Sequence, residues 1–248
     1  GASRGWCAVR SGVRLVGGRG RVGFGVRPLG NPVAWRAGQG RFHLFVVATG
    51  LGGWAAGRIM HLVQVDDGKD FSKLAFRPLR VLPLSWLWKT SHLVRAAPLP
   101  LADGGMVLPA YFELGTKYPV ALRFDATGEF RGMVRISSRR HLLQPTLLMR
   151  SETDWLALMR DSSVEKKIGV AQTLDGGQHW QDLPDLPLAN PDASIAGLAL
   201  QPGKLFLAHN PLPDSRAVLD LSVSRDGLRW TQLQTLERRN APDEYSYP

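Results

Sequence analysis

Charged side chains follow apolar runs at several points along this chain of 248 residues. Arg95 comes directly after Leu93-Val94, and Arg160 comes directly after the run from Leu156 to Met159. A guanidinium can bind a carboxylate through two parallel hydrogen bonds, so two such arginines predict a site for a carboxylate. A surface arginine, or an arginine in a salt bridge at the end of a strand, would give the same pattern.

Other polar side chains follow apolar runs or lie in turns. Glu113 ends an apolar run and would orient an arginine or assist a tyrosine, whereas an ordinary solvated strand end is the simpler interpretation. Lys117 would add positive charge, although exposed lysines are common. Gln144, Asn190 and Asp192 are candidates for binding hydroxyl groups, but Asn190-Pro191-Asp192 is an equally good turn.

Short apolar runs separated by turns must position these side chains. The run from Phe42 to Thr49 is rich in β-branched and aromatic residues, which is typical of a buried strand. No period of 3.6 residues persists over more than two helical turns, so an all-β chain is predicted. Four strand-rich units are expected, beginning near residues 30, 91, 144 and 190.

The segment from Thr173 to Trp180 marks the end of the third unit. Asp175 can bond its own backbone and the glycines after it accept positive φ, so the segment predicts a tight hairpin turn. Thr173 would bond this turn, and Trp180 would pack over it. The spacing Ser/Thr-x-Asp-x-Gly-x-x-Trp resembles the Asp-box of sialidase-like BNR-repeat β-propellers. We expect Asp175 to hold a hairpin and not to act as a catalytic acid.

Two further segments resemble the same motif. Gln64 to Phe71 keeps the aspartate and glycine, and Ser224 to Trp230 is one residue shorter. A four-stranded blade takes roughly 40–50 residues. The interval from Asp66 to Asp175 therefore fits two blades, and the interval from Asp175 to Asp226 fits one. The expected fold is therefore a sialidase-like β-propeller, six-bladed by family resemblance, of which the chain would cover about four to five blades.

The first thirty residues differ in composition from the rest. They carry six arginines and no acid, which accounts for most of the net charge of +10. These arginines form no motif and no regular alternation with aromatic side chains, so nucleic acid is not an expected partner. Residues 1–29 are predicted to be a poorly ordered lead or a degraded first blade, and residues 30–248 to form the propeller domain.

Several classes of protein and site are disfavoured. The one cysteine, Cys7, allows no internal disulfide. No apolar run approaches the roughly 18 residues of a membrane helix, and no secretory signal is visible, so a soluble chain without a membrane span is expected. Histidines, cysteines and carboxylates lack metal-ligand spacing, so neither a metal nor another cofactor is expected. The compartment and the oligomeric state stay open.

A longer series of segments is similar to bacterial sialidase-like BNR-repeat proteins and extends from residue 30 to the end of the chain. These segments are Gly30-Asn31-Pro32-Val33, Thr90-Ser91-His92-Leu93-Val94-Arg95, Tyr111-Phe112-Glu113-Leu114, Leu143-Gln144-Pro145, Met159-Arg160-Asp161, Asn190-Pro191-Asp192 and Tyr245-Ser246-Tyr247-Pro248. The resemblance implies a glycoside hydrolase of the exo-α-sialidase type that acts on sialic acid or another acidic sugar.

The resemblance also implies roles for individual residues. Sialidases hold the substrate carboxylate with three arginines, and they use a tyrosine nucleophile with a glutamate base and an aspartate acid. Arg95 and Arg160 would belong to the carboxylate clamp. Tyr247 or Tyr245 would be the nucleophile, with Glu113 as its partner. The candidates for hydroxyl binding would contact the sugar.

Two elements of the family pattern are missing from their expected places. The third arginine is expected beyond Pro248, and no aspartate stands near Asn31 to supply the acid. A carbohydrate-binding propeller without catalysis is therefore an alternative, and it predicts convergent arginines without an aspartate. A protein-interaction scaffold is a second alternative, and it predicts an apolar face without convergent charge.

Overall fold

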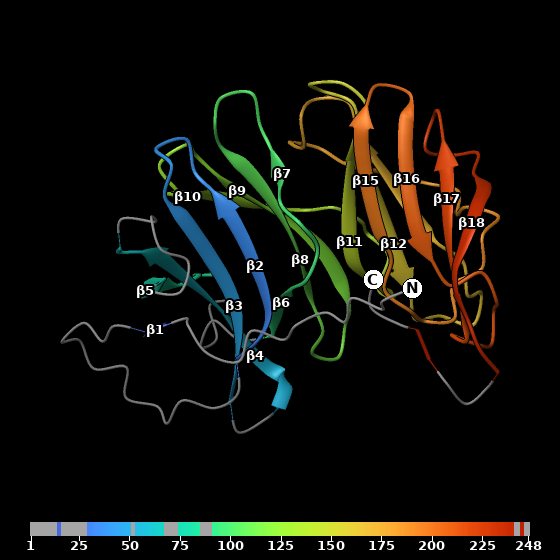
Figure 1. Ribbon diagram of the computed structural model, residues 1–248, viewed down its shortest axis with the longest axis horizontal. Helices are drawn as coiled ribbons and strands as arrows, with labels where there is room; N and C mark the ends of the chain where they lie inside the picture. Colours follow the sequence, from blue (N-terminus) through green and yellow to red (C-terminus); the bar gives the residue numbers. More distant parts are fainter. Residues whose placement is uncertain are drawn as a thin grey trace, which may run out of the picture.

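The regular structure of the chain consists of β-strands (Figure 1). The computed structural model describes residues 14–15, 29–50, 53–66, 74–84, 91–240 and 244–245. Within these ranges no helix is long and apolar enough to cross a membrane. The prediction of an all-β chain is confirmed.

The first sheet has the strand order β1-β5-β4-β3-β2. Its strands are β1 (Arg14–Leu15), β2 (Leu29–Arg36), β3 (Phe42–Gly50), β4 (Gly53–Gln64) and β5 (Ala75–Val81). Strands β2 to β5 pair antiparallel, and β1 pairs parallel with β5. The described residues of the N-terminal segment thus add an edge strand to this sheet.

The second sheet has five strands, and the third and fourth are four-stranded antiparallel meanders. The second contains β6 (His92–Val94), β8 (Met106–Phe112), β9 (Tyr118–Phe124) and β10 (Phe130–Arg135), with the short β7 (Leu99–Pro100) also pairing with β8. The third contains β11 (Leu142–Met149), β12 (Trp155–Asp161), β13 (Gly169–Thr173) and β14 (Gln181–Leu183). The fourth contains β15 (Ala196–Gln201), β16 (Lys204–His209), β17 (Val218–Ser224) and β18 (Thr231–Arg238).

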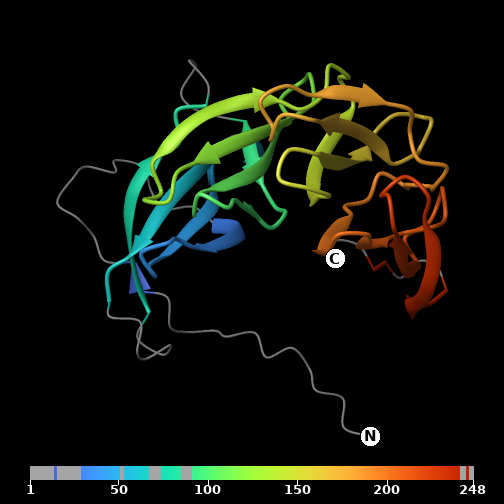
Figure 2. The same cartoon turned by 90° about the horizontal axis from the view of Figure 1, so that it is seen from above.

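The four sheets follow one another around an arc, with the first and fourth sheets at its ends (Figure 2). Strand β6 contacts the first sheet, β11 contacts the second, and β15 contacts β11 of the third. The first strand of each sheet therefore lies against the sheet before it, which is how the blades of a propeller pack. The predicted β-propeller fold is confirmed, with four blades in the described residues.

Apolar layers between neighbouring sheets form the core. Phe45 and Leu108 belong to the layer between the first and second sheets. The next layer contains Trp155, and the third contains Leu156. Because side chains alternate along a strand, β12 sends Trp155 to one neighbour and Leu156 to the other. This explains why the whole run from Trp155 to Met159 is apolar and buried.

The predicted Asp-box in the third sheet forms the hairpin between β13 and β14. Asp175 Oδ1 accepts hydrogen bonds from the backbone N–H groups of Gln178 and His179, both at 2.9 Å, and from Thr173 Oγ1 at 2.8 Å. Trp180 Nε1 donates to the carbonyl of Gly177 at 3.2 Å. These bonds, led by the backbone bond from His179, hold the pKa of Asp175 below its ordinary value. Asp175 therefore holds the hairpin, as expected for an Asp-box.

The shorter motif in the fourth sheet forms the same structure. Asp226 Oδ1 accepts from the backbone N–H groups of Leu228 and Arg229 at 2.8 Å. Trp230 Nε1 donates to the Gly227 carbonyl at 2.9 Å. A motif that is one residue shorter therefore preserves both the carboxylate bonds and the tryptophan bond.

The second sheet contains a related turn that the sequence pattern does not predict. Asp125 Oδ1 accepts from the backbone of Thr127 and Glu129, at 2.9 and 3.0 Å. No serine or threonine precedes this aspartate at the usual spacing, and Phe130 takes the place of the tryptophan. In the first sheet, Asp66 Oδ2 accepts from Ala75 N at 2.6 Å, and residues 67–71 of that motif lie outside the described ranges.

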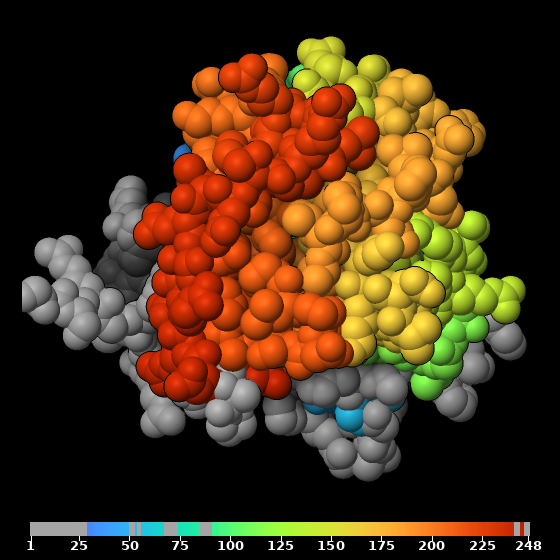
Figure 3. Space-filling model, turned by 90° about the vertical axis from the view of Figure 1, so that its right-hand side faces the viewer, coloured from blue at the N-terminus to red at the C-terminus, as the bar shows by residue number. Residues whose placement is uncertain are grey.

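The outer side of the fourth sheet is exposed at one end of the arc (Figure 3). Leu198 of β15 pairs with Phe206 of β16, which pairs with Val223 of β17, so these three side chains share one face. Leu198 is 56% exposed and Phe206 is only partly buried. The sheets nearer the middle of the arc bury both of their faces, as β12 shows.

Candidate functional site

Strand pairing places polar side chains from successive sheets at one end of the blades. Tyr111 of β8 pairs with Leu93 on the first strand of its sheet, and Arg160 of β12 pairs with Leu143 on the first strand of the next. Trp155, at the other end of β12, pairs with Thr173 of the Asp-box. Five residues of strand, roughly 16 Å, therefore separate the box from Arg160.

Four residues at the start of the four sheets share a left-handed backbone. Their φ angles are +48° at Asn31, +72° at Ser91, +48° at Gln144 and +54° at Asp192. Non-glycine residues adopt this conformation rarely, at an expense of order 1–3 kcal/mol, and such residues cluster at functional sites. Asn31 and Gln144 each precede a proline and lie in a register shift, Asn31 in β2 and Gln144 in β11. The two sheets therefore use the same bulge at the same place.

Gln144 joins three sheets through its side-chain amide. Its Oε1 accepts from Arg160 Nη1 at 3.3 Å and from Ser194 Oγ at 2.5 Å. Its Nε2 donates to the Tyr111 hydroxyl at 3.2 Å. Tyr111 comes from β8, Arg160 from β12, and Ser194 from the segment before β15. The amide is buried, so these bonds fix the orientation of Gln144.

Arg160 is bound on a second side by Asp192. Its Nε lies 2.5 Å from Asp192 Oδ1, and the side chains are 12% and 42% exposed, respectively. Arg216 Nη2 donates to the backbone carbonyl of Asp192 at 2.6 Å, and Arg216 Nη1 lies 3.5 Å from Glu244 Oε2. The guanidinium of Arg160 is thus held in place by Gln144 and Asp192.

Arg95 and Glu113 lie close enough to act electrostatically on Tyr111. Burial raises the pKa of the Tyr111 hydroxyl, and the hydrogen bond from Gln144 opposes this effect. The negative charge of Glu113 raises the pKa further, while the positive charges of Arg160 and Arg95 lower it. The backbone of Glu113 is fixed by a 3.1 Å bond from its N–H to the Ser91 carbonyl. Two arginines and one carboxylate therefore act electrostatically on the Tyr111 hydroxyl.

Of the remaining predicted residues, Asn190 and Lys117 have other contacts. The Asn190 side chain bonds the backbone of Ala193 through both its amide nitrogen, at 2.8 Å, and its oxygen, at 3.1 Å. These are the bonds of the turn that was the alternative interpretation of Asn190. Lys117 donates its backbone N–H to the Arg140 carbonyl at 3.3 Å. Hydroxyl binding by Asn190 and added charge from Lys117 stay predictions.

The two predicted tyrosines lie near the end of the chain. Tyr245 donates its N–H to the Arg216 carbonyl at 2.8 Å, and its carbonyl accepts from Asn210 Nδ2 at 2.9 Å. Because Arg216 also bonds Asp192, Tyr245 is linked to the cluster through one residue. Tyr247 lies outside the described residues.

Three members of the cluster were not predicted, namely Tyr111, Ser194 and Arg216. Tyr111 had a usable signal, because it lies at the end of the second strand of its sheet just as Arg160 does. Ser194 and Arg216 had none, since their contacts with Gln144 and Asp192 join segments whose side chains meet only after folding.

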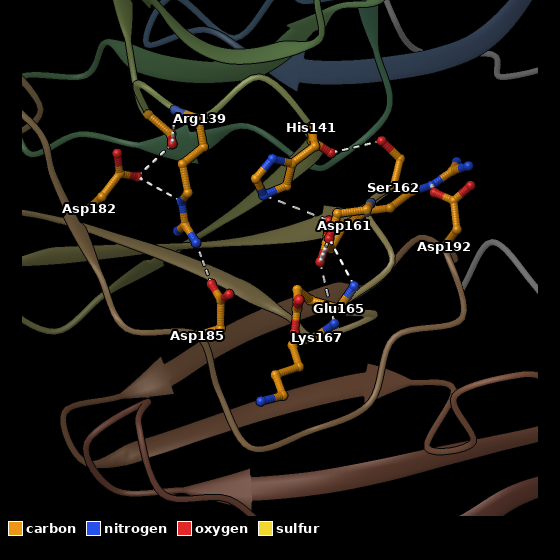
Figure 4. A network of polar contacts seen from close by, with 12 residues as sticks. Arg139, His141, Asp161, Ser162, Glu165, Lys167, Asp182, Asp185 and Asp192 are labelled. Carbon is orange, nitrogen blue, oxygen red and sulfur yellow. Dashed lines mark hydrogen bonds and ion pairs between the residues drawn. The ribbon is translucent and has the colours of Figure 1, made fainter.

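A separate polar network supports the third sheet beside this cluster (Figure 4). Asp161, which is buried, accepts from the backbone N–H and the hydroxyl of Ser163, both at 2.7 Å, so it is a turn residue. Arg139 extends between Asp182 and Asp185, and its Nη2 donates to the Val170 carbonyl at 2.9 Å. Asp161 thus fixes the β12–β13 connection that follows Arg160, whereas Arg139 joins β13 and β14.

The described part of the chain contains no group of three histidine, cysteine or carboxylate side chains able to hold a metal ion. The cluster offers hydrogen-bond donors to a ligand. Two guanidinium groups act on one phenol, and carboxylates accompany them. Such an arrangement suits an anion with oxygen atoms.

Comparison with known proteins points to one family. The BNR repeat-like domain matches residues 15–248. No curated protein sequence matches significantly. The fold is similar to a Hadza microbial sialidase, with a TM-score of 0.63 and 15% identity over 84% of this chain and 46% of that one.

Two further solved structures are similar. A Trypanosoma rangeli sialidase, described as a covalent intermediate with 2,3-difluorosialic acid, has a TM-score of 0.62 and 13% identity over 84% of this chain and 39% of that one. A protein of unknown function from Dyadobacter fermentans has a TM-score of 0.62 and 11% identity over 84% and 65% of the two chains. The present chain spans less than half the length of either sialidase. The TM-scores show a common fold, and at identities this low the likeness extends to the fold alone.

Proposed function

We propose, from the premise that this chain belongs to the BNR repeat-like domain family, that it binds the carboxylate of an acidic sugar of the sialic acid type. The observation that carries the proposal is the hydrogen-bonded series Tyr111–Gln144–Arg160–Asp192, which crosses three sheets and lies near Arg95. Similar proteins are described with sialic acid analogues, which supports the ligand class.

Arg160 is the central residue of the proposed site. Its side chain is 12% exposed, so water competes weakly for its charge. Gln144 and Asp192 hold the guanidinium before the ligand arrives, so less side-chain entropy is lost on binding. Arg95, which acts electrostatically on the same tyrosine, supplies the second positive charge.

Hydrolysis of the glycosidic bond, of the exo-α-sialidase type, is the further step of the proposal. Glu113 would assist a tyrosine nucleophile, Tyr247 or Tyr245, and Gln144, Asn190 or Asp192 would contact the sugar. Tyr245 is linked to Asp192 through Arg216, which supports its place at the rim of the site.

Sugar binding without hydrolysis is the second candidate, and a specific observation favours it. In the first sheet the left-handed position equivalent to Gln144 is occupied by Asn31, a neutral amide. The family resemblance expects an aspartate acid near Asn31, and none stands there. Loss of general acid catalysis lowers a rate by roughly 10²–10⁴-fold. A protein-interaction scaffold is less well supported. It predicts no convergent charge, whereas Arg95, Arg160 and Glu113 all act electrostatically on Tyr111.

The test is calorimetric titration of the chain with N-acetylneuraminic acid, together with turnover of a fluorogenic α-sialoside. Arg160→Ala is expected to weaken binding by at least about tenfold, because a hydrogen bond to a charged group contributes about 1.5–3 kcal/mol. Arg160→Lys keeps the charge but loses the planar fork, so an intermediate loss is expected.

Arg131→Ala is the matched control. Arg131 pairs with Asp125 at the Asp-box end of the second sheet and is 63% exposed, so this variant removes the same charge away from the site. Wild-type binding is expected. Equal weakening in Arg131→Ala and Arg160→Ala would mean that overall charge, and not the cluster, attracts the sugar. Binding without turnover would select the second candidate function.

A further inference from the structure

The hydrogen bonds around Gln144 have a fixed direction. Arg160 can only donate, and its Nη1 lies 3.3 Å from Gln144 Oε1. Ser194 Oγ approaches the same oxygen at 2.5 Å. The amide oxygen must therefore face Arg160 and Ser194, which turns the amide nitrogen toward Tyr111. An amide flipped the other way would place two donors against each other.

This direction determines what the Tyr111 hydroxyl can do. Gln144 Nε2 donates to it at 3.2 Å, so the phenolic oxygen accepts and its hydrogen points elsewhere. Within the described residues this is the one hydrogen bond of the hydroxyl. A buried hydroxyl normally donates as well as accepts, because an unused donor is expensive in the interior.

The surroundings of Tyr111 indicate the kind of acceptor. One negative charge, Glu113, and two positive charges, Arg160 and Arg95, act on the hydroxyl, so positive charge is in excess and a negatively charged oxygen is favoured there. Burial and the charge of Glu113 raise the pKa of the phenol, which therefore keeps its proton at neutral pH. Tyr111 is thus suited to donate a hydrogen bond and poorly suited to act as a nucleophile.

We infer that Tyr111 is a specificity-determining residue whose hydroxyl donates to the ligand carboxylate beside Arg95 and Arg160, and that Gln144 is the positioning residue that aims it. The inference rests on the proposed function and assigns a role to two side chains within that site. It replaces direct sugar contact as the main role of Gln144.

The test compares two probes, N-acetylneuraminic acid and its methyl ester, by calorimetry. Tyr111→Phe removes one oxygen atom, and it is expected to weaken binding of the acid by about tenfold while changing binding of the ester less than about twofold, because a bond to a charged acceptor is the stronger one. Tyr118→Phe removes a hydroxyl from the same sheet outside the cluster and is expected to leave both affinities unchanged.

A second variant tests the direction of the hydrogen bonds. In Gln144→Glu the side chain can only accept, so Tyr111 is expected to donate to residue 144 instead of the ligand. Adding Tyr111→Phe to this variant should then leave the ratio of acid to ester affinity unchanged. Such non-additivity is the mark of groups that act through one another.

The outcomes separate the two proposals. If the wild-type chain binds neither probe, the proposed function is wrong and the inference is wrong with it. If the wild-type chain prefers the acid but Tyr111→Phe weakens both probes equally, only the inference is overturned. The inference is also overturned if Tyr111→Phe lowers the preference for the acid as much in the Gln144→Glu background as in the wild type.

Discussion

Gly177→Ala is expected to lower the free energy of unfolding by about 2–5 kcal/mol, because two separate effects add. Gly177 has a φ of +88°, which side chains rarely tolerate. A Cβ there would lie 2.7 Å from Cζ3 of Trp155, a fully buried side chain that cannot move away. Equilibrium unfolding in urea, followed by tryptophan fluorescence, would measure the loss.

Gly176→Ala is the matched control, because this glycine precedes Gly177 in the same hairpin. Its φ is +69°, but a Cβ there would meet nothing closer than 3.7 Å. Only the backbone strain of about 1–2 kcal/mol is therefore expected. Equal losses for the two variants would show that contact with Trp155 contributes nothing, and that backbone conformation alone requires glycine at both positions of this hairpin.

The Asp-boxes can be predicted from sequence because their interactions are local. Thr173, Asp175 and Trp180 all bond within eight consecutive residues, so spacing alone carries the signal. The related turn at Asp125 escapes prediction because it lacks the serine or threonine and the tryptophan. Its backbone hydrogen bonds show that the turn forms around the aspartate without those two residues.

The cluster at the other end of the blades depends on contacts between distant segments. The position of Arg160 at the end of a strand is visible in the sequence, and so is Gln144 at a turn. The role of Gln144 is not visible, because it is set by Tyr111 and Ser194 from the two neighbouring sheets. The turn at Asn190, by contrast, is visible in the sequence, because its bonds to Ala193 join residues only three apart.

A pair of buried histidines predicts that the fold loses stability in mild acid. His43 Nδ1 lies 2.7 Å from His61 Nε2, and Arg80 Nε lies 3.5 Å from His61 Nδ1. Arg80 donates to Nδ1, so neutral His61 carries its proton on Nε2 and donates to His43. A second proton on His61 would face Arg80. Burial, followed by the charges of His43 and Arg80, lowers the pKa of His61 to about 3.

The sign of the effect follows from proton binding. In the unfolded chain His61 takes up a proton below pH 6.5, whereas in the folded chain it does so only near pH 3. Stability is therefore fully present above about pH 7 and falls as the pH drops. Between pH 7.5 and pH 5, His61 alone is expected to remove about 2 kcal/mol from the free energy of unfolding. The lowered pKa of His43, caused first by burial, adds to this loss.

Urea unfolding at pH 7.5, 6 and 5, for the wild type and His61→Gln, would test this prediction. Glutamine cannot titrate, so the variant should lose about 2 kcal/mol less than the wild type over this range, even if it is less stable at pH 7.5. Asp125 and Asp175 do not interfere, because hydrogen bonds lower the pKa of each carboxylate and place its titration below this range. His209, whose pKa burial also lowers, keeps part of the pH dependence in the variant. An unchanged pH dependence in His61→Gln would show that the folded protein accommodates a charged His61, against the geometry of its contacts with His43 and Arg80.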